Sequence, residues 1–302
     1  MVENETPDAV AILDACFARS GRAFRIGITG PPGAGKSTLV ARIAQEYRSR
    51  NETVAIVAVD PTSPFSGGAL LGDRVRMADL AEDAGVFIRS MATRGSMGGL
   101  AVNTAQACDV LDAAGYARIL IETVGVGQSE LEVAETSDST AVVLVPESGD
   151  TVQAMKAGLM EIGDLFVINK ADRDGADRAA YAVQAALELR TAQRDWPTPV
   201  LLTMALEGTG VPELVDRFEE HLDHLKSRGG LERRRRRRLE QRLEDLMRAR
   251  LWRRFRARVP GAKWAECVAA MADRKLTPHQ AAELLIAGAM DPDGGGTVGE
   301  RP

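Results

Sequence analysis

The chain consists of short apolar runs separated by segments in which apolar residues recur at helical spacing. Seven runs lack polar alternation, which is typical of strands buried on both faces of a sheet. They are Phe24 to Thr29, Val54 to Asp60, Val86 to Met91, Arg118 to Val124, Thr140 to Pro146, Leu165 to Lys170 and Pro199 to Ala205. Because strands and helices alternate, we predict an α/β fold with a doubly wound, mostly parallel sheet.

The pattern is helical at both ends of the chain. Asp8 to Ala18 predicts a short leading helix, and from Ser227 to about Ile286 only helical periodicity remains. One apolar stripe follows an arginine-rich helix there, and it must be buried against another surface. Its residues are Leu239, Leu243, Leu246, Met247, Leu251 and Phe255. We therefore expect an N-terminal helical segment (1–24), one large domain (25–226), a C-terminal helical arm (227–290) and a disordered tail (291–302).

Composition favours a globular protein of the cytoplasm. The 302 residues, 45% of them hydrophobic, suffice for a large core with appendages. No run of about 18 apolar residues and no signal-peptide pattern occurs, so no membrane span is expected. The three cysteines, Cys16, Cys108 and Cys267, are far apart. This spacing favours buried thiols over a disulfide framework or a metal site.

The charge is unevenly distributed. Ser227 to Arg258 carries 14 arginines and four acids, a net +10, whereas the whole chain carries −5. Arg233 to Arg238 could follow the phosphates of a nucleic acid. The run has no interleaved aromatic residues, however, and neighbouring acids allow ion pairs along the helix. We expect a solvated helix at a dimer edge and no nucleic-acid partner. His221 and His224, three residues apart on another helix, are expected to be surface histidines because no further metal ligands accompany them.

A phosphate-binding loop follows the first predicted strand. Residues 30–37 read GPPGAGKS, which matches G-x-x-x-x-G-K-[ST] between a strand and a helix. The glycines let successive amides point inward, and the helix start near Lys36 adds its positive dipole end. We expect Lys36 to reach the β and γ phosphates, Ser37 to bind Mg²⁺ and Thr38 to contact the α phosphate. The full phosphate-binding set is Gly30, Gly33, Ala34, Gly35, Lys36, Ser37 and Thr38.

A second motif predicts guanine specificity. NKAD, Asn169 to Asp172, ends the strand LFVIN. The Asp172 carboxylate can accept hydrogen bonds from N1–H and the 2-amine of guanine, whereas adenine would leave it unpaired. Asn169 and Lys170 belong to the same base site. The segment MALEG after the last strand should offer backbone amides to the guanine carbonyl, from Met204, Ala205 or Leu206.

Three carboxylates are candidates for Mg²⁺ and its waters. Asp60 and Glu122 end strands, and Asp73 follows in GALLGDRVRM. Oxygen ligands at carboxyl ends of strands beside a phosphate loop suit this metal. Asp73 can alternatively cap the helix that follows it. The Gly125 amide is expected to contact the γ phosphate.

These motifs together resemble the MeaB/ArgK family of P-loop GTPases, chaperones of adenosylcobalamin-dependent acyl-CoA mutases. The resemblance covers about Gly21 to Ala287. It rests on GITGPPGAGKST, VAVDPTSPFSGGALLGDRVRM, SMATRGSMGGL, IETVGVGQSE, VPESGDTVQAMKAGLMEIGD and NKAD, in this order.

The resemblance implies that Lys36, Asp60, Asp73 and Glu122 act on Mg²⁺-GTP. It also implies switches in DRVRM, in ETVGVGQSE and in Ser148 to Lys156, and a dimerisation arm in the C-terminal helices. Residue pattern alone reads Ser148 to Lys156 as an ordinary helix start capped by Asp150. Family members commonly have a longer helical N-terminal segment than the 24 residues that precede the large domain here.

The expected reaction is attack of water on the γ phosphate of GTP, which depends on positioning and charge neutralisation. Gln128 is the candidate for positioning water, although small GTPases have glutamine directly after the switch glycine, where this chain has Val126. We expect slow hydrolysis that a partner stimulates.

Two other functions share parts of this pattern. A GTPase that inserts metal into hydrogenase or urease would need a Cys/His cluster, which the sequence lacks. A protein kinase, an older label of this family, would transfer phosphate to protein. The sequence does not distinguish methylmalonyl-, ethylmalonyl- and isobutyryl-CoA mutases as the client.

Overall fold

The computed structural model describes residues 7–60, 78–92, 99–123, 129–146, 158–189 and 195–290. The chain forms two compact units, Met1–Arg238 and Leu239–Pro302. Residues 227–238, which the sequence pattern placed with the arm, therefore belong to the first unit.

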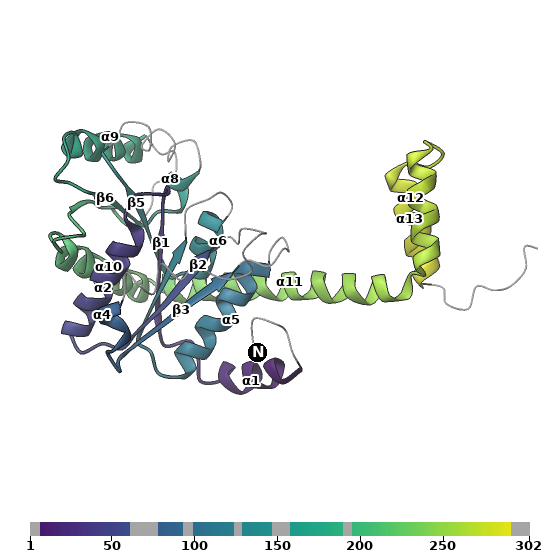
Figure 1. Cartoon of the computed structure of the whole chain (residues 1–302), viewed down its shortest axis with the longest axis horizontal. Coiled ribbons are helices and arrows are strands. Elements are labelled where there is room, and N and C mark those ends of the chain that lie inside the picture. Colours follow the sequence, from purple (N-terminus) through teal and green to yellow (C-terminus); the bar gives the residue numbers. More distant parts are fainter. Residues whose placement is uncertain are drawn as a thin grey trace, which may run out of the picture. The chain divides into compact units, whose positions relative to one another are not determined.

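The first unit is built on one seven-stranded sheet in the order β3-β2-β4-β1-β5-β6-β7 (Figure 1). Every pairing between neighbouring strands is parallel. The strands are β1 (Phe24–Thr29), β2 (Val54–Asp60), β3 (Val86–Ala92), β4 (Arg118–Thr123), β5 (Ser139–Leu144), β6 (Leu165–Asn169) and β7 (Val200–Thr203). All seven expected strands are confirmed, and the doubly wound α/β class with them.

Helices cover both faces of the sheet (Figure 1). One face packs against α2 (Lys36–Ser49), α4 (Ala78–Ala81) and α10 (Val211–Ser227). The other packs against α5 (Gly99–Ala113), α6 (Ser129–Thr136), α8 (Leu159–Ile162) and α9 (Ala176–Glu188). The expected leading helix is α1 (Pro7–Phe17), which lies against α5.

The continuous apolar runs are explained by this double cover. Alternate residues of a strand point to opposite faces, so Ile26 and Ile28 of β1 pack in the core beside α2 and α10. In β4, Ile119 and Ile121 pack in the core beside α5 and α6. All four side chains have no exposed surface, which is why neither face shows polar alternation.

The strand order changes direction at β1. The chain runs from β1 outward to β2 and β3, returns to β4, and then crosses to β5, β6 and β7 on the other side. Ligands of open α/β sheets bind where the order reverses, beyond the carboxyl ends of the strands. The segment after β1 therefore occupies the expected ligand position of this fold.

The second unit is helical. From Leu239 onward it contains the rest of α11 (Gly230–Arg258), with α12 (Gly261–Ala272) and α13 (Pro278–Met290). Its small core contains Val259, Cys267, Ala281, Leu285 and Ala289. Of the stripe on α11, Phe255 packs against this core, whereas Leu239, Leu243, Met247 and Leu251 are between 47% and 62% exposed. Within the described residues, no helix is both long and apolar enough to span a bilayer.

Candidate functional site

The loop after β1 has the backbone of a phosphate cradle. Gly30, Gly33 and Gly35 have φ values of 135°, 79° and 84°, a region that favours glycine. A β-carbon on Gly30 would also clash with the backbone oxygen of Val143 on β5. The glycines of the motif are thus required by the backbone itself.

Helix α2 begins at Lys36, directly after the loop. The amides of its first turn have no partner inside the helix and lie at its positive end, which suits an anion. Lys36 is 5% exposed, and its Nζ donates to the backbone oxygens of Gly30 at 2.8 Å and Pro31 at 2.9 Å. A buried ammonium is therefore held inside the curve of the loop.

Ser37 and Glu122 meet at the carboxyl end of the sheet. The Ser37 hydroxyl donates to Glu122 Oε1 at 2.5 Å, and Glu122 is 3% exposed. The strand register explains this meeting, because Ile28 of β1 and Ala58 of β2 both pair with Glu122 of β4. A hydroxyl and a carboxylate here fit a magnesium site, whose oxygen ligands they could supply.

The structure describes only part of the remaining residues that were predicted to bind metal or to form switches. The backbone of Asp60 ends β2 at the same edge of the sheet, while its side chain lies outside the description. Asp73, Gly125, Gln128 and the whole of Ser148 to Lys156 lie outside the described residues. Their roles stay predictions.

Asn169 ties the phosphate loop to the predicted base site. Its Nδ2 donates to the backbone oxygen of Ala34 at 2.8 Å, and its Oδ1 accepts from the Thr203 hydroxyl and the Ala205 amide, both at 3.1 Å. The side chain is 2% exposed. One buried amide thus joins the loops after β1, β6 and β7, and fixes the distance between the two ends of the site.

Lys170 and Asp172 follow β6 at the rim. Lys170 has a φ of 59°, and its Nζ donates to the backbone oxygen of Gly33 at 2.8 Å. Asp172 is exposed in the turn that follows. Its carboxylate is therefore accessible to a ligand.

One contact of this site was not foreseen. Arg42 on α2 donates through Nε to the backbone oxygen of Ala205 at 3.1 Å and through Nη2 to that of Leu206 at 2.5 Å. Nothing in the local sequence distinguishes Arg42 from the other arginines of α2, since its partners lie more than 160 residues away.

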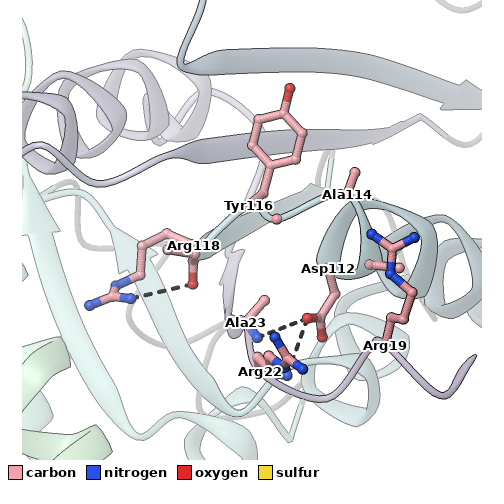
Figure 2. Close-up of a pocket in the computed structure, with 10 residues that line it drawn as sticks. Arg19, Arg22, Ala23, Asp112, Ala114, Tyr116 and Arg118 are labelled. Atoms are coloured by element: carbon pink, nitrogen blue, oxygen red, sulfur yellow. Dashed lines mark hydrogen bonds between the residues drawn. The ribbon is translucent and has the colours of Figure 1, made fainter. Parts of the chain in front are cut away.

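A cavity of about 410 Å³ lies at the opposite edge of the sheet. Figure 2 shows Asp112 beside the segment that leads into β1, with its carboxylate accepting from the amides of Arg22 and Ala23. Arg118, also in the lining, is paired with Glu219 at 3.0 Å. Because Ala23 precedes β1, the cavity is at the amino ends of the strands, away from the phosphate loop.

At the same amino edge, three arginines of α11 are bound by the domain itself. Both terminal nitrogens of Arg234 donate hydrogen bonds to the Asp164 carboxylate, each at 2.8 Å. Arg235 and Arg238 pair with Asp138 at 3.0 and 2.6 Å. The expectation of a solvated basic helix is therefore wrong for these three. At spacings i, i+1 and i+4 they share one helix face, and this face meets buried carboxylates.

The prediction of two surface histidines is wrong for His221. Its side chain has no exposed surface, its Nδ1 lies 2.8 Å from the Ser139 hydroxyl, and its ring contacts that of Trp196 at a tilt of 41°. Helical spacing was a usable signal, because the residue lies within the apolar face of α10. The other members of that face are Val211, Leu214, Val215, Phe218, Leu222 and Leu225.

The cysteine prediction is confirmed for two of the three residues. Cys108 and Cys267 are buried, while Cys16 is half-buried. Burial raises the pKa of the Cys108 thiol to about 11. Within the described part of the chain, no group of three or more His, Cys, Asp or Glu side chains could hold a metal ion.

Comparison with known proteins identifies the family of the chain. The sequence model of a family described as methylmalonyl-CoA mutase-associated GTPase MeaB matches residues 1–259. A protein of Pyrococcus abyssi named as a GTPase is 44% identical over 95% of this chain and 89% of its own length. GTPase ArgK of Escherichia coli is 40% identical over 71% of this chain and 67% of its own length.

Two further comparisons extend this result. The mouse protein named methylmalonic aciduria type A homolog is 40% identical over 69% of this chain and 51% of its own length. A crystal structure described as a LAO/AO transport system kinase is 28% identical and has a TM-score of 0.73, covering 95% of this chain and 89% of that one.

Proposed function

The chain belongs to the MeaB family of methylmalonyl-CoA mutase-associated GTPases, and on that premise we propose that it is a Mg²⁺-dependent GTPase chaperone of an adenosylcobalamin-dependent acyl-CoA mutase. GTP binding and hydrolysis would be coupled to cofactor loading and to protection or reactivation of the mutase. Binding of GTP and GDP is a property of the family. The mutase as client, and the cytoplasm as the location, are parts of the proposal.

The observation that carries the proposal is the position of Asn169. This buried side chain links the phosphate loop to the loop after β7, which supports a phosphate cradle and a base site that are held together. In the proposal, Asp172 accepts from the guanine edge and the 204–206 segment donates to O6. Adenine would leave the carboxylate unpaired, which disfavours ATP.

The phosphate end supplies charge neutralisation. The Lys36 ammonium, now on the carbonyls of Gly30 and Pro31, would turn to the β and γ phosphates. Ser37 and Glu122, with Asp60 and Asp73, would hold Mg²⁺, which supplies further positive charge to the phosphates. Gly125 would contact the γ phosphate and Gln128 would orient the water. Hydrolysis by the isolated protein would be slow, because a partner completes the site.

The C-terminal helices would form a homodimer. Four residues of the α11 stripe are about half exposed in the single chain, and a second copy would cover them. The proposed parts are an N-terminal segment (1–24), a GTPase domain (25–226) to whose compact unit residues 227–238 also belong, an arm that continues to residue 290 and a tail (291–302). Nucleic acid is not a proposed partner, because Arg234, Arg235 and Arg238 already pair with carboxylates of the chain.

The proposal is tested by mixing the protein and γ-labelled GTP with methylmalonyl-CoA mutase under turnover. We expect labelled phosphate to be released faster than in the absence of the mutase. We also expect the mutase to be inactivated more slowly than in the absence of GTP. The Lys36→Ala variant is the control and should give neither effect. If neither the rate of phosphate release nor the rate of mutase inactivation changes, the proposed chaperone function is wrong. If the label appears on protein instead of in free phosphate, the chain is a kinase.

A further inference from the structure

The loop after β7 presents one backbone amide to a ligand. Three amides of this loop donate hydrogen bonds within the loop. The Met204 amide donates to the backbone oxygen of Thr209, and the Glu207 and Gly208 amides donate to that of Met204. The Ala205 amide donates to Asn169. Among the described residues no acceptor serves the Leu206 amide. Of the three residues expected to read guanine O6, only Leu206 has an amide without an acceptor in the described part of the chain.

The direction of that amide is set by the carbonyl of the same peptide group. In a trans peptide the C=O of one residue and the N–H of the next point in opposite directions, and the described chain contains no cis peptide. Arg42 binds the Ala205 oxygen at 3.1 Å. The Leu206 N–H therefore points away from α2. Arg42 also binds the next carbonyl, that of Leu206, so it holds two successive peptide groups.

Arg42 is itself held in place. Its third contact, from Nη1, is to Gln45 Oε1 on the same helix at 3.1 Å. A planar guanidinium with all three nitrogens bonded has little freedom to turn. Because α2 also carries Lys36 and Ser37, the helix that presents the phosphate-binding groups also sets the orientation of the base-reading loop.

We propose that Arg42 is a positioning residue for guanine recognition, which orients the peptide between Ala205 and Leu206 so that the Leu206 amide donates to guanine O6. The inference rests on the proposed guanine specificity and adds the group that enforces it. A cation on the carbonyl also polarises the peptide and strengthens its N–H as a donor. Adenine has an amine at this position and would meet that donor with another donor.

The test compares nucleotides that differ only at the base edge. The affinities of GDP, IDP and 6-thio-GDP are measured by calorimetry, with Mg²⁺ present, for the wild type and Arg42→Ala. GDP and IDP both have O6, whereas 6-thio-GDP has a sulfur there, a poor acceptor. We expect Arg42→Ala to weaken GDP and IDP about tenfold, the effect of one hydrogen bond, and 6-thio-GDP less than about twofold.

Two variants make the result specific. Arg50→Ala, at the C-cap of the same helix, removes ion pairs to Glu46 and Asp216 and should change no affinity. Arg42→Lys retains a cation but cannot hold two carbonyls with a fork of donors, so it should lose part of the GDP affinity. If thermal melting shows that Arg42→Ala is misfolded, the nucleotide comparison is made with Arg42→Lys instead.

The outcomes separate the inference from the function beneath it. An equal loss for all three nucleotides, or no loss, would overturn the positioning role. A wild-type protein that binds ADP as tightly as GDP would overturn the guanine site and this inference with it. A wild type that prefers GDP, with a selectivity that Arg42→Ala leaves unchanged, would remove the inference alone.

Discussion

The Arg238 guanidinium donates to Asp138 Oδ1 at 2.6 Å, and the Asp138 side chain has no exposed surface. Arg235 pairs with the other carboxylate oxygen at 3.0 Å, and the backbone amide of Arg25 donates to the same oxygen at 3.1 Å. The first turns of α11 are thereby fixed to the amino edge of the sheet by a buried carboxylate.

Replacement of this carboxylate should strongly destabilise the first unit. Asp138→Asn leaves Arg235 and Arg238 half-buried without their counter-charge, and loss of one side of a buried pair costs about 3–5 kcal/mol. The control is Glu244→Gln, which removes a pair with Arg248 on the exposed face of α11 and should cost less than about 1 kcal/mol. Urea unfolding measures both. Similar midpoints for the two variants would contradict the structural role of Asp138.

The same carboxylate should make stability depend on pH. Burial raises the pKa of Asp138, but the guanidinium groups of Arg238 and Arg235 outweigh burial and lower the pKa from 3.8 to about 2. Because the folded pKa is below the unfolded one, the contribution is complete above about pH 5 and is lost as pH falls through 4 to 2. This amounts to about 2–3 kcal/mol.

Unfolding measured at several pH values between 6 and 3 tests this expectation. The difference in free energy of unfolding between the wild type and Asp138→Asn should shrink as the solution is acidified. A difference that is constant over this range would mean that the Asp138 carboxylate titrates alike in the folded and unfolded chains.

Asp172 should determine which base the site accepts. In Asp172→Asn the side-chain amide places an N–H donor opposite the 2-amine of guanine, which is also a donor. The same N–H can pair with the 2-carbonyl of xanthine. We expect GDP affinity to fall at least about 100-fold, since hydrogen bonds to a charged group contribute about 1.5–3 kcal/mol each, while XDP affinity rises. Calorimetry with GDP and XDP measures both. Unchanged GDP binding would remove Asp172 from the site.

The exposed stripe on α11 should hold two chains together. Leu243→Glu places a charge at a residue that is 62% exposed in the single chain and should convert a dimer to a monomer in sedimentation experiments, because a buried unpaired charge is costly. Arg248→Ala, about 140° around the helix from Leu243, should leave the assembly unchanged. If the wild type is monomeric at micromolar concentration, the proposed homodimer is wrong.

Features encoded by neighbouring residues could be predicted from the sequence. The seven strands, the phosphate loop and the start of α2 each depend on a short stretch, and the structure agrees with them within two residues. Continuous apolar runs identify buried strands because both faces of this sheet are covered. The motifs then follow strand ends, where the fold places ligands.

Contacts between distant residues could not be predicted in this way. Arg238 and Asp138 are 100 residues apart, and Arg42 and Ala205 are 163 apart. From the sequence alone, a basic run or an isolated arginine is typical of a solvated surface. Only the topology shows which carboxylates or carbonyls face these side chains. His221 differs, since its place within the apolar face of α10 was visible in the sequence.

The central claim is that the nucleotide state controls the interaction with a mutase. A ligand shifts an equilibrium only by the difference in its affinity for the two states. The most direct measurement is the dissociation constant for methylmalonyl-CoA mutase in the presence of GDP and of a non-hydrolysable GTP analogue. The account predicts values that differ at least about fivefold, the lower end of typical coupling. Equal values would contradict it, because the γ phosphate would then have no effect on the partner.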